Sequence, residues 1–315
     1  MSFSDLPRLD WHAQFFPLLA RSRQGIPVFY CDEMIAPSQG ERSESSKARY
    51  AVQYWNRLGL PARYVKPRPA CRSDIARAHD RAYVDGVLDL ARDNGYGTRD
   101  PRVAESLPYV VGAFLDAARE AVNTGLVAVV PVADAQEAGF AAGRYGSTFN
   151  GFIAAALALK HLGLVRQVTI LDFEEGESSG IPDLMARLGL DWITYVPLAA
   201  RMFARYLKDA FLRHLKRAME GAWFPLGDLL MVQASACMLL RGDRGVLTMK
   251  EMAERDRIVF EGAAALHVPV LWTLGSGYWP SLRTTLITHS VTMRECARVY
   301  AAPALSEPLR RTGWV

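Results

Sequence analysis

Short apolar runs alternate with longer amphipathic segments along most of this chain. The runs at 126–131 and 167–172 are too apolar for half-exposed strands, which predicts strands buried on both faces. Helical periodicity follows them at 149–162 and 182–188. Strands that alternate with helices at this spacing favour one parallel sheet with helices on both faces. In such a sheet, chemistry is expected at the carboxyl ends of the strands.

The remaining pattern extends this α/β arrangement over the chain. No Pro/Ser-rich linker and no internal repeat interrupts it, so we expect residues 1–315 to form a single domain. Further strands are predicted at 26–31, 192–196, 228–233 and 268–274, and further helices at 51–60, 74–91 with Asp74 as N-cap, 105–122, 206–219, 249–266 and 291–302.

Composition restricts the class of partner. The chain has 315 residues, of which 50% are hydrophobic and 22% charged, with a formal net charge of +4. No run of five or more Lys/Arg residues occurs, which argues against nucleic acid as a partner. The basic segment 201–220 has helical spacing, and a solvated amphipathic face is favoured over an anionic-surface site.

The four cysteines indicate a reducing environment. They form no C-x-x-C pair, so neither a disulfide framework nor a zinc knuckle is expected. The N-terminal segment lacks the pattern of a signal peptide, and no apolar run approaches the roughly 18 residues of a membrane span. We therefore expect a cytoplasmic protein without membrane contact. The cysteines are Cys31, Cys71, Cys237 and Cys296.

An acidic cluster follows the buried run at 167–172. Asp172 ends the run, Glu174 and Glu175 follow, and Gly176 opens a loop. Three further segments have the same character, each an apolar run that ends in small or polar residues: Pro131-Val-Ala-Asp-Ala-Gln136-Glu137, Gln233-Ala-Ser-Ala-Cys237 and Gly275-Ser-Gly277-Tyr278.

In order and separation, these segments resemble the arginase/deacetylase family, which includes histone deacetylases and acetylpolyamine amidohydrolases. The similarity extends over about residues 28–300. It implies a three-layer α/β/α fold, and the family's reaction is zinc-dependent amide hydrolysis. The family motifs read roughly D-x-D-x-H-x-G-D-G-T at the acidic strand end, H-H-A-G-Y after the preceding strand, and Q-A-G-A-D at a later strand end.

Read residue by residue, the resemblance implies a degenerate zinc site. Glu174, Gly176 and Cys237 stand at the three ligand positions, and Gln136 and Glu137 at the two catalytic histidines. Other pocket positions also differ from the family pattern. Gly146 stands in place of the tunnel aromatic, and Arg144 and Tyr145 stand in place of small glycines. Asp172 is kept, but the histidine that it would orient is absent. Gly277 and Tyr278 keep the glycine-rich turn and its hydroxyl.

These substitutions predict that no zinc is held. Glu and Cys can ligate zinc, so Glu174 and Cys237 remain candidates, but glycine offers no side chain and two ligands do not normally hold a catalytic ion. Glu177 lies one residue past the lost histidine and would point the other way in an extended segment. Gln136 cannot titrate, and Glu137 would need a strongly raised pKa to act as a base.

Three hypotheses follow. The first is a pseudo-deacetylase that acts by ligand binding or by assembly. The second is a recast enzyme that acts on an acyl or amide substrate through Cys237, Glu137 and Tyr278. The third is a zinc-dependent amidohydrolase with an atypical site.

The partners expected are a small anionic or acyl ligand, with Arg144 at the pocket rim, and a second copy of the chain or a catalytic subunit. Self-association is placed in the loop 31–49, by analogy with bacterial family members. His79 is expected to be a structural or rim residue, not a ligand, and to lie in a helix.

Overall fold

Seven parallel strands form one sheet in the computed structural model. The structure describes residues 25–36, 44–133, 135–176, 178–198, 208–240, 245–277 and 281–301. The strand order is β2-β1-β3-β7-β6-β4-β5. The strands are β1 (Ile26–Phe29), β2 (Ala62–Val65), β3 (Val127–Val130), β4 (Val168–Asp172), β5 (Ile193–Pro197), β6 (Leu229–Gln233) and β7 (Val270–Thr273).

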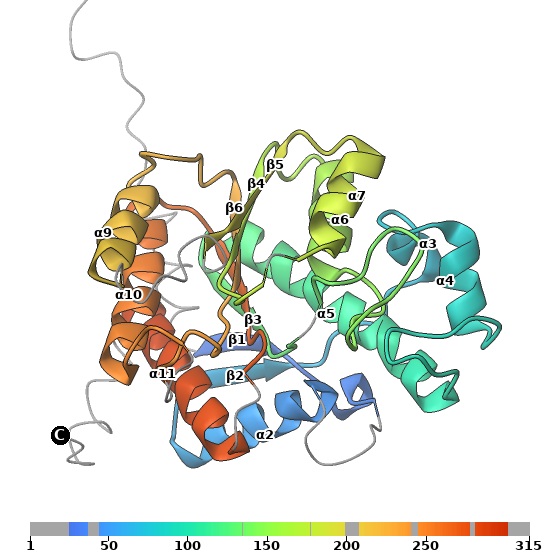
Figure 1. The fold of residues 1–315 in the computed structure, drawn as a ribbon, viewed down its shortest axis with the longest axis horizontal. Coiled ribbons are helices and arrows are strands. Elements are labelled where there is room, and N and C mark those ends of the chain that lie inside the picture. The colour runs from blue at the N-terminus through green and yellow to red at the C-terminus, as the bar shows by residue number, and fades with distance from the viewer. Residues whose placement is uncertain are drawn as a thin grey trace, which may run out of the picture.

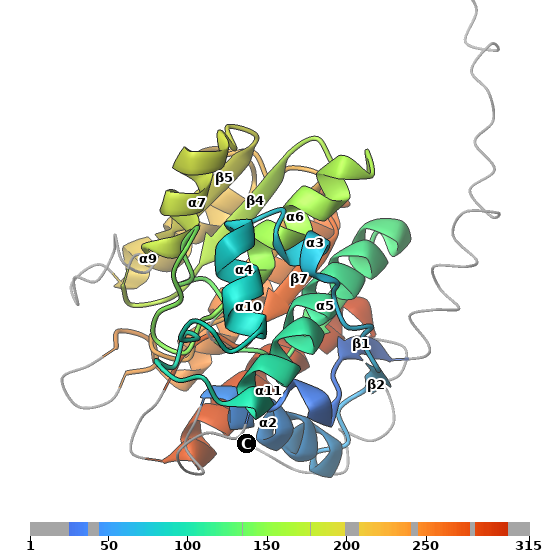
Figure 2. The ribbon, with the colours of Figure 1, turned by 90° about the vertical axis from the view of Figure 1, so that its right-hand side faces the viewer.

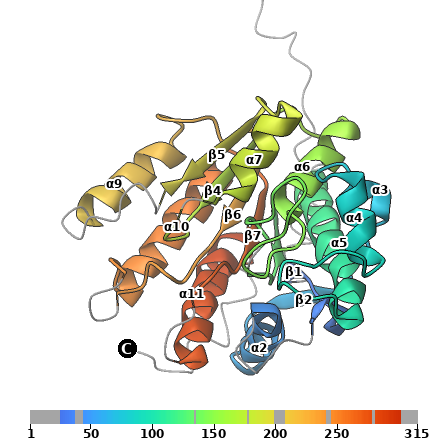
Figure 3. The same ribbon diagram turned by 45° about the vertical axis from the view of Figure 1, so that its right-hand side comes forward.

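Helices cover both faces of the sheet (Figures 1 and 3). One layer holds α2 (Glu44–Arg57), α9 (Lys208–Met219), α10 (Met249–Ala265) and α11 (Leu282–Tyr300). The other holds α3 (Arg72–Ile75), α4 (Arg81–Leu88), α5 (Pro101–Thr124), α6 (Gly151–His161) and α7 (Gly180–Leu188). A 3-10 turn, η1 (Asp32–Met34), follows β1.

A hydrophobic core fills each side of the sheet. Trp55, Trp272 and Phe260 pack together on the side of α2 and α10, while Phe114 and Phe152 pack edge to face between α5 and α6. The central strands are buried along their whole length, because both of their faces are covered. The predicted fold class is thereby confirmed, and none of the described helices is long and apolar enough to cross a membrane.

The predicted helix 74–91 was wrong, because the chain there forms two short helices. Cys71 precedes α3 and Asp80 caps α4, where its carboxylate accepts a hydrogen bond from the N–H of Tyr83. The break occurs at His79, which therefore lies between helices and not within one. Its ring is buried by contacts with a distant loop, and these contacts override the helical periodicity of the segment.

Two helix boundaries and one strand also differ from the prediction. Helix α2 begins at Glu44, in a stretch expected to be a polar loop, and α11 begins at Leu282 where the helix was expected at 291. Strand β2 was not predicted, since its four residues are only half-buried at the sheet edge. The assignment of residues 1–315 to one domain stays a prediction.

Candidate functional site

Three neighbouring strands end level with one another at the centre of the sheet. The register pairs Asp172 at the end of β4 with Gln233 on β6, and Gln233 with Thr273 on β7. The residues two positions beyond these ends, Glu174 and Ser235 among them, therefore emerge side by side. Because parallel strands share their carboxyl edge, this is where the sequence predicted the site.

The carboxylate of Glu174 is enclosed by protein donors. Its Oε1 accepts hydrogen bonds from Gln233 Nε2 at 3.0 Å and from the main-chain N–H of Ser276 at 2.5 Å. Its Oε2 accepts from the hydroxyls of Ser235, at 3.1 Å, and Ser276. We call Glu174, Gln233, Ser235 and Ser276 the Glu174 clasp. The side chain is 7% exposed, so these donors replace water as its partners.

Two buried cationic side chains bind the segments that carry the Glu174 clasp. Lys47 on α2 donates to the carbonyl of Gly275 at 3.1 Å, and Arg255 on α10 donates to the carbonyl of Ser235 at 2.8 Å. Their side chains are 1% and 0% exposed. Arg255 also pairs with Asp256 at 2.7 Å and lies over the ring of Phe173. Both cations therefore bind main-chain carbonyls of the segments that carry Ser235 and Ser276.

Two more carboxylates lie near Glu174. Burial and the charge of Glu174 raise the pKa of Asp172 to about 7, and its carboxylate accepts from Tyr195 Oη at 2.8 Å and from the N–H of Glu174 at 2.9 Å. Partial burial is also the main cause of a raised pKa at Glu137, with a contribution from Glu174. The N–H of Ser179 lies 3.4 Å from Glu137 Oε2. These three predicted site residues are therefore brought together.

Cys237 belongs to the same region, but its thiol faces inward. Its Sγ donates to the carbonyl of Phe173 at 3.4 Å, and its N–H donates to Ser235 Oγ at 3.1 Å. Burial, together with the charge of Glu174, raises the pKa of this thiol well above its usual value. The residue is 5% exposed and behaves as a small core side chain.

Gln136 is buried, and its main chain orders the loop that carries it. Its carbonyl accepts from Ser178 Oγ at 2.7 Å and Asn150 Nδ2 at 3.1 Å. The N–H of Asn150 donates to His79 Nε2 at 2.8 Å, so His79 Nδ1 carries the proton and donates to the carbonyl of Gly139 at 2.9 Å. His79 is therefore structural, as expected from the sequence.

The other predicted residues lie apart from the clasp or have different surroundings. Gly176 is exposed, and a Cβ added to it would meet no atom within 4 Å. Arg144 is exposed and reaches Ser179 Oγ at 3.3 Å. The carbonyl of Gly277 accepts from the Thr285 hydroxyl. Tyr278 and Glu177 lie outside the described residues.

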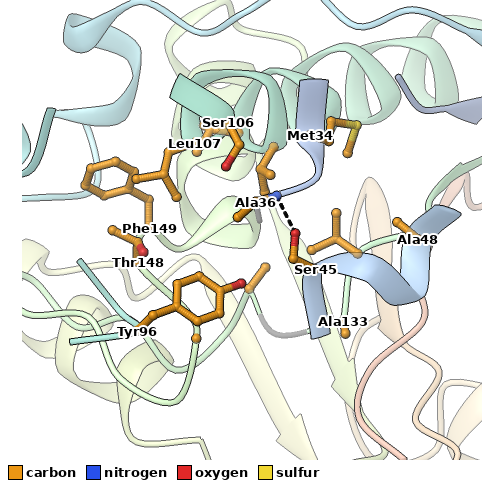
Figure 4. Close-up of a pocket in the computed structure, with 15 residues that line it drawn as sticks. Met34, Ala36, Ser45, Ala48, Tyr96, Ser106, Leu107, Ala133, Thr148 and Phe149 are labelled. Carbon is orange, nitrogen blue, oxygen red and sulfur yellow. Dashed lines mark hydrogen bonds between the residues drawn. The ribbon is translucent and has the colours of Figure 1, made fainter. Parts of the chain in front are cut away.

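A pocket opens beside Gly146, between η1, α2 and α5 (Figure 4). Its cavity volume is about 50 Å³, so it accommodates only a small group. Its walls are mostly apolar, and none of the residues that line it is charged. Tyr96 lies over Gly146, with its Cε1 atom 3.2 Å from the position of an added Cβ. The lining includes Met34, Ala36, Ser45, Ala48, Tyr96, Leu107, Ala133, Thr148 and Phe149.

The hydroxyls in this pocket already take part in hydrogen bonds. Ser45 Oγ accepts from the N–H of Ala36 at 2.6 Å, which holds η1 against the start of α2 (Figure 4). Thr148 Oγ1 accepts from the N–H of Gly95 at 2.9 Å, and Ser106 Oγ donates to the carbonyl of Val103 at 2.8 Å. The pocket therefore offers an apolar surface, and the hydroxyls of Ser45, Ser106 and Thr148 are already used in hydrogen bonds within the protein.

Solved structures share this architecture at low sequence identity. The HD domain of HDA15 matches with a TM-score of 0.68 and 13% identity over 89% of each chain. An acetylpolyamine aminohydrolase from Burkholderia pseudomallei matches with a TM-score of 0.63 and 14% identity, over 87% of this chain and 99% of that one. The chain has the arginase/deacetylase fold. No protein-family model matches it, and no curated protein matches it.

The residues of this deacetylase-fold chain do not fit the zinc ion that the fold implies. Both oxygens of Glu174 accept hydrogen bonds from protein donors, Gly176 has no ligand atom, and the Cys237 thiol donates to a carbonyl. No three His, Cys, Asp or Glu side chains within the described residues are arranged to hold a metal. Zinc needs three deprotonated protein ligands with free lone pairs, and this donor set does not supply them.

Sequence reasoning missed the residues that complete the deacetylase-fold site. Ser235 and Ser276 stood within the quoted motifs, but short Ser/Gly stretches are usual in turns and gave no sign of a shared acceptor. Lys47 lies in a run of serines and charges that reads as a loop. The signal for Ser235 and Ser276 was their spacing, because each lies two or three residues after a predicted strand, as Glu174 does.

Proposed function

We propose that this protein does not hydrolyse amides through zinc but acts by binding a small ligand with an acyl-type chain. The observation that carries this proposal is the Glu174 clasp. A carboxylate that ligates a metal must turn its lone pairs to the ion, whereas the carboxylate of Glu174 accepts from Gln233, Ser235 and Ser276. Metal binding would break these bonds, and each buried donor left without a partner costs about 1–3 kcal/mol.

The pocket beside Gly146 supports an apolar ligand group over an anionic one. Its lining carries no charge, and the hydroxyls of Ser45, Ser106 and Thr148 are engaged within the protein. Arg144 was expected to attract an anion at the rim, but it is not among the residues that line this pocket. Short acyl chains match such a surface because their binding rests on burial of apolar area.

The alternative of a cysteine-based enzyme has less support. A nucleophilic thiol needs a lowered pKa or an adjacent base, whereas burial raises the pKa of Cys237 and its Sγ donates to Phe173. Glu137 interacts with Glu174 and Ser179, and no hydrogen bond joins it to Cys237 within the described residues. A zinc-dependent amidohydrolase is disfavoured by the same clasp.

Self-association and a cytoplasmic location remain part of the proposal. The segment 31–49, where we placed an oligomer contact, contributes Met34, Ala36, Ser45 and Ala48 to the pocket lining. An interface there would touch the pocket, so ligand binding and assembly would depend on each other. Light scattering with and without ligand measures this dependence.

The decisive experiment combines metal analysis with ligand binding. We expect less than about 0.1 zinc per chain, no change in melting temperature with a chelator, and no turnover of acetyl-lysine or acetylpolyamine substrates. N-alkyl acetamides and longer acylamides serve as probes in calorimetry. Stoichiometric zinc together with turnover that Glu174→Ala abolishes would overturn the proposal.

A matched pair of variants assigns the ligand to the pocket. Ala48→Leu adds three carbon atoms to the pocket face of α2, and we expect it to weaken acylamide binding at least about tenfold. Gln53→Leu adds a leucine to the exposed side of the same helix and should leave binding unchanged. Equal affinities of the two variants would place the ligand elsewhere.

A further inference from the structure

A second cleft lies between segment 68–74, α5 and α6. Helices α3, α5 and α6 lie together in one layer of the fold (Figure 2). Its cavity volume is about 270 Å³, and it shares no lining residue with the pocket beside Gly146. Small-molecule sites commonly occupy about 300–1,000 Å³. The volume of this cleft lies just below that range, so it suits a ligand of only a few carbon atoms.

Tight packing of segment 68–70 on α5 fixes the shape of the cleft. A Cβ added at Gly112 would lie 1.8 Å from the carbonyl oxygen of Arg68, so only glycine permits this approach. The N–H of Ala70 donates to the carbonyl of Pro108 at 2.8 Å. Both contacts join main-chain atoms, so the cleft is formed before any ligand arrives.

One guanidinium in the cleft lining has no hydrogen-bonded or ion-paired partner among the described residues. Arg68 uses its guanidinium to pair with Asp116, at 2.6 Å between Nη2 and Oδ1. Asp74 accepts from the thiol of Cys71 at 2.9 Å. Arg119, by contrast, makes no hydrogen bond or ion pair with any residue in the described ranges. A half-buried guanidinium without a partner gains from a carboxylate that it can bind through two N–H groups.

The rest of the cleft lining is largely apolar. Leu115 comes from α5, and Ala158, Leu159 and Leu162 come from the end of α6 and the turn after it. Leu162 is 51% exposed, which is high for a large aliphatic side chain. Asp74 and Asp116 also line the cleft and disfavour a dianion such as phosphate, so a monoanion with a short aliphatic chain suits the lining best.

We propose that this cleft is a second binding site, for a small aliphatic carboxylate that pairs with Arg119 and lays its chain against Leu115 and Leu162. Nothing in this site depends on the chemistry of the Glu174 clasp. The two proposals can therefore fail separately.

Cys71 is a reporter for this site. It lines the cleft and is exposed, whereas Cys31, Cys237 and Cys296 are buried. Butyrate is the probe, and the rate at which iodoacetamide alkylates Cys71 in the folded chain is the readout. At a butyrate concentration about four times its Kd we expect the rate to fall roughly fivefold, because the thiol reacts only in the ligand-free fraction. Butan-1-ol should give no protection.

Variants of Arg119 decide the outcome. Arg119→Gln should abolish protection, Arg119→Lys should keep part of it, and Arg166→Gln, at a side chain 91% exposed, should keep all of it. Without ligand, Arg119→Gln should also lower the ratio of iodoacetate to iodoacetamide rates about twofold, and salt should lower that ratio in the wild type. The proposal is overturned if butyrate gives no protection or protects the Gln variant equally. If that variant fails to fold, a salt-independent ratio in the wild type overturns it.

Discussion

Ser276 donates both its main-chain N–H and its side-chain hydroxyl to the carboxylate of Glu174, a residue 102 positions earlier in the chain. The two residues follow β7 and β4, which flank β6 on either side. The carboxylate thereby ties together the ends of two strands that do not pair with each other. Hydrogen bonds to an ionised, buried carboxylate are among the stronger contacts in a protein.

The first prediction concerns the strength of this tie. Glu174→Ala should destabilise the fold by at least about 3 kcal/mol, because several buried donors lose their acceptor at once. In a double-mutant cycle with Ser276→Ala, the coupling should be about 1.5–3 kcal/mol. Urea unfolding measures both. Glu175→Ala, at the exposed neighbouring position, is the control. A coupling near zero would mean that the hydroxyl contact contributes nothing.

The second prediction concerns competition between the clasp and a metal. Gly176→His and Cys237→Asp together restore three ligand types beside Glu174, and the open space at Gly176 accepts a side chain. We expect this variant to bind zinc weakly, because Ser276 still donates two hydrogen bonds to the Glu174 carboxylate. Adding Ser276→Ala should tighten zinc binding about tenfold, the worth of one hydrogen bond to a charged group. An unchanged Kd in a chelator competition assay would show that the clasp does not compete.

The third prediction is a pH dependence of stability at His79. Burial lowers the pKa of this imidazole to about 4, from 6.5 in the unfolded chain. The unfolded state therefore binds the proton first on acidification. The stabilising contribution is fully present above pH 6.5 and is lost as the pH falls through about 4, with a total of about 3 kcal/mol.

Variants isolate this contribution in urea unfolding across that range. His79→Gln should be less stable near neutral pH and should show a flatter dependence on acidification. His161→Gln, at the exposed end of α6, should keep the wild-type slope. An equal slope in all three proteins would contradict the assignment.

The fourth prediction separates backbone strain from pocket shape. Gly146 has φ +85° and its added Cβ would press on Tyr96, whereas Gly97 has φ +70° with no atom within 4 Å. Both Gly→Ala changes should cost about 1–2 kcal/mol for the left-handed backbone. Only Gly146→Ala should also change acylamide affinity, because it displaces the Tyr96 ring. Calorimetry that finds the same affinity in both variants would rule out Tyr96 as a wall of the ligand site.

The fold could be predicted from the sequence because buried parallel strands leave a strong apolar signal. The runs that became β3, β4, β6 and β7 were recognised at nearly the observed bounds, and their ends marked the site. The failures share one cause. The helix expected at 74–91 broke at His79, and α2 and α11 were longer than expected, where contacts distant in sequence decide the local conformation.

The candidate site could be predicted only in part. Asp172, Glu174 and Cys237 were expected to lie together, and they do. Their partners could not be foreseen, since a serine or glutamine near a strand end has the same local sequence whether it faces solvent or a carboxylate. Lys47 illustrates the difficulty, because its burial depends on the packing of α2 against the turn at Gly275.

The strand order also determines when the sheet can form during synthesis of the chain. β7 is the last of the described strands, yet it pairs with β3 on one side and β6 on the other. Before residue 273 is synthesised, the nascent chain can form only two separate half-sheets, β2-β1-β3 and β6-β4-β5. Each has an unpaired apolar edge strand, β3 or β6, that pairs with β7 in the complete sheet. The protein should therefore complete its core only after β7 has left the ribosome, and truncation before β7 should yield an aggregating product and not a smaller domain.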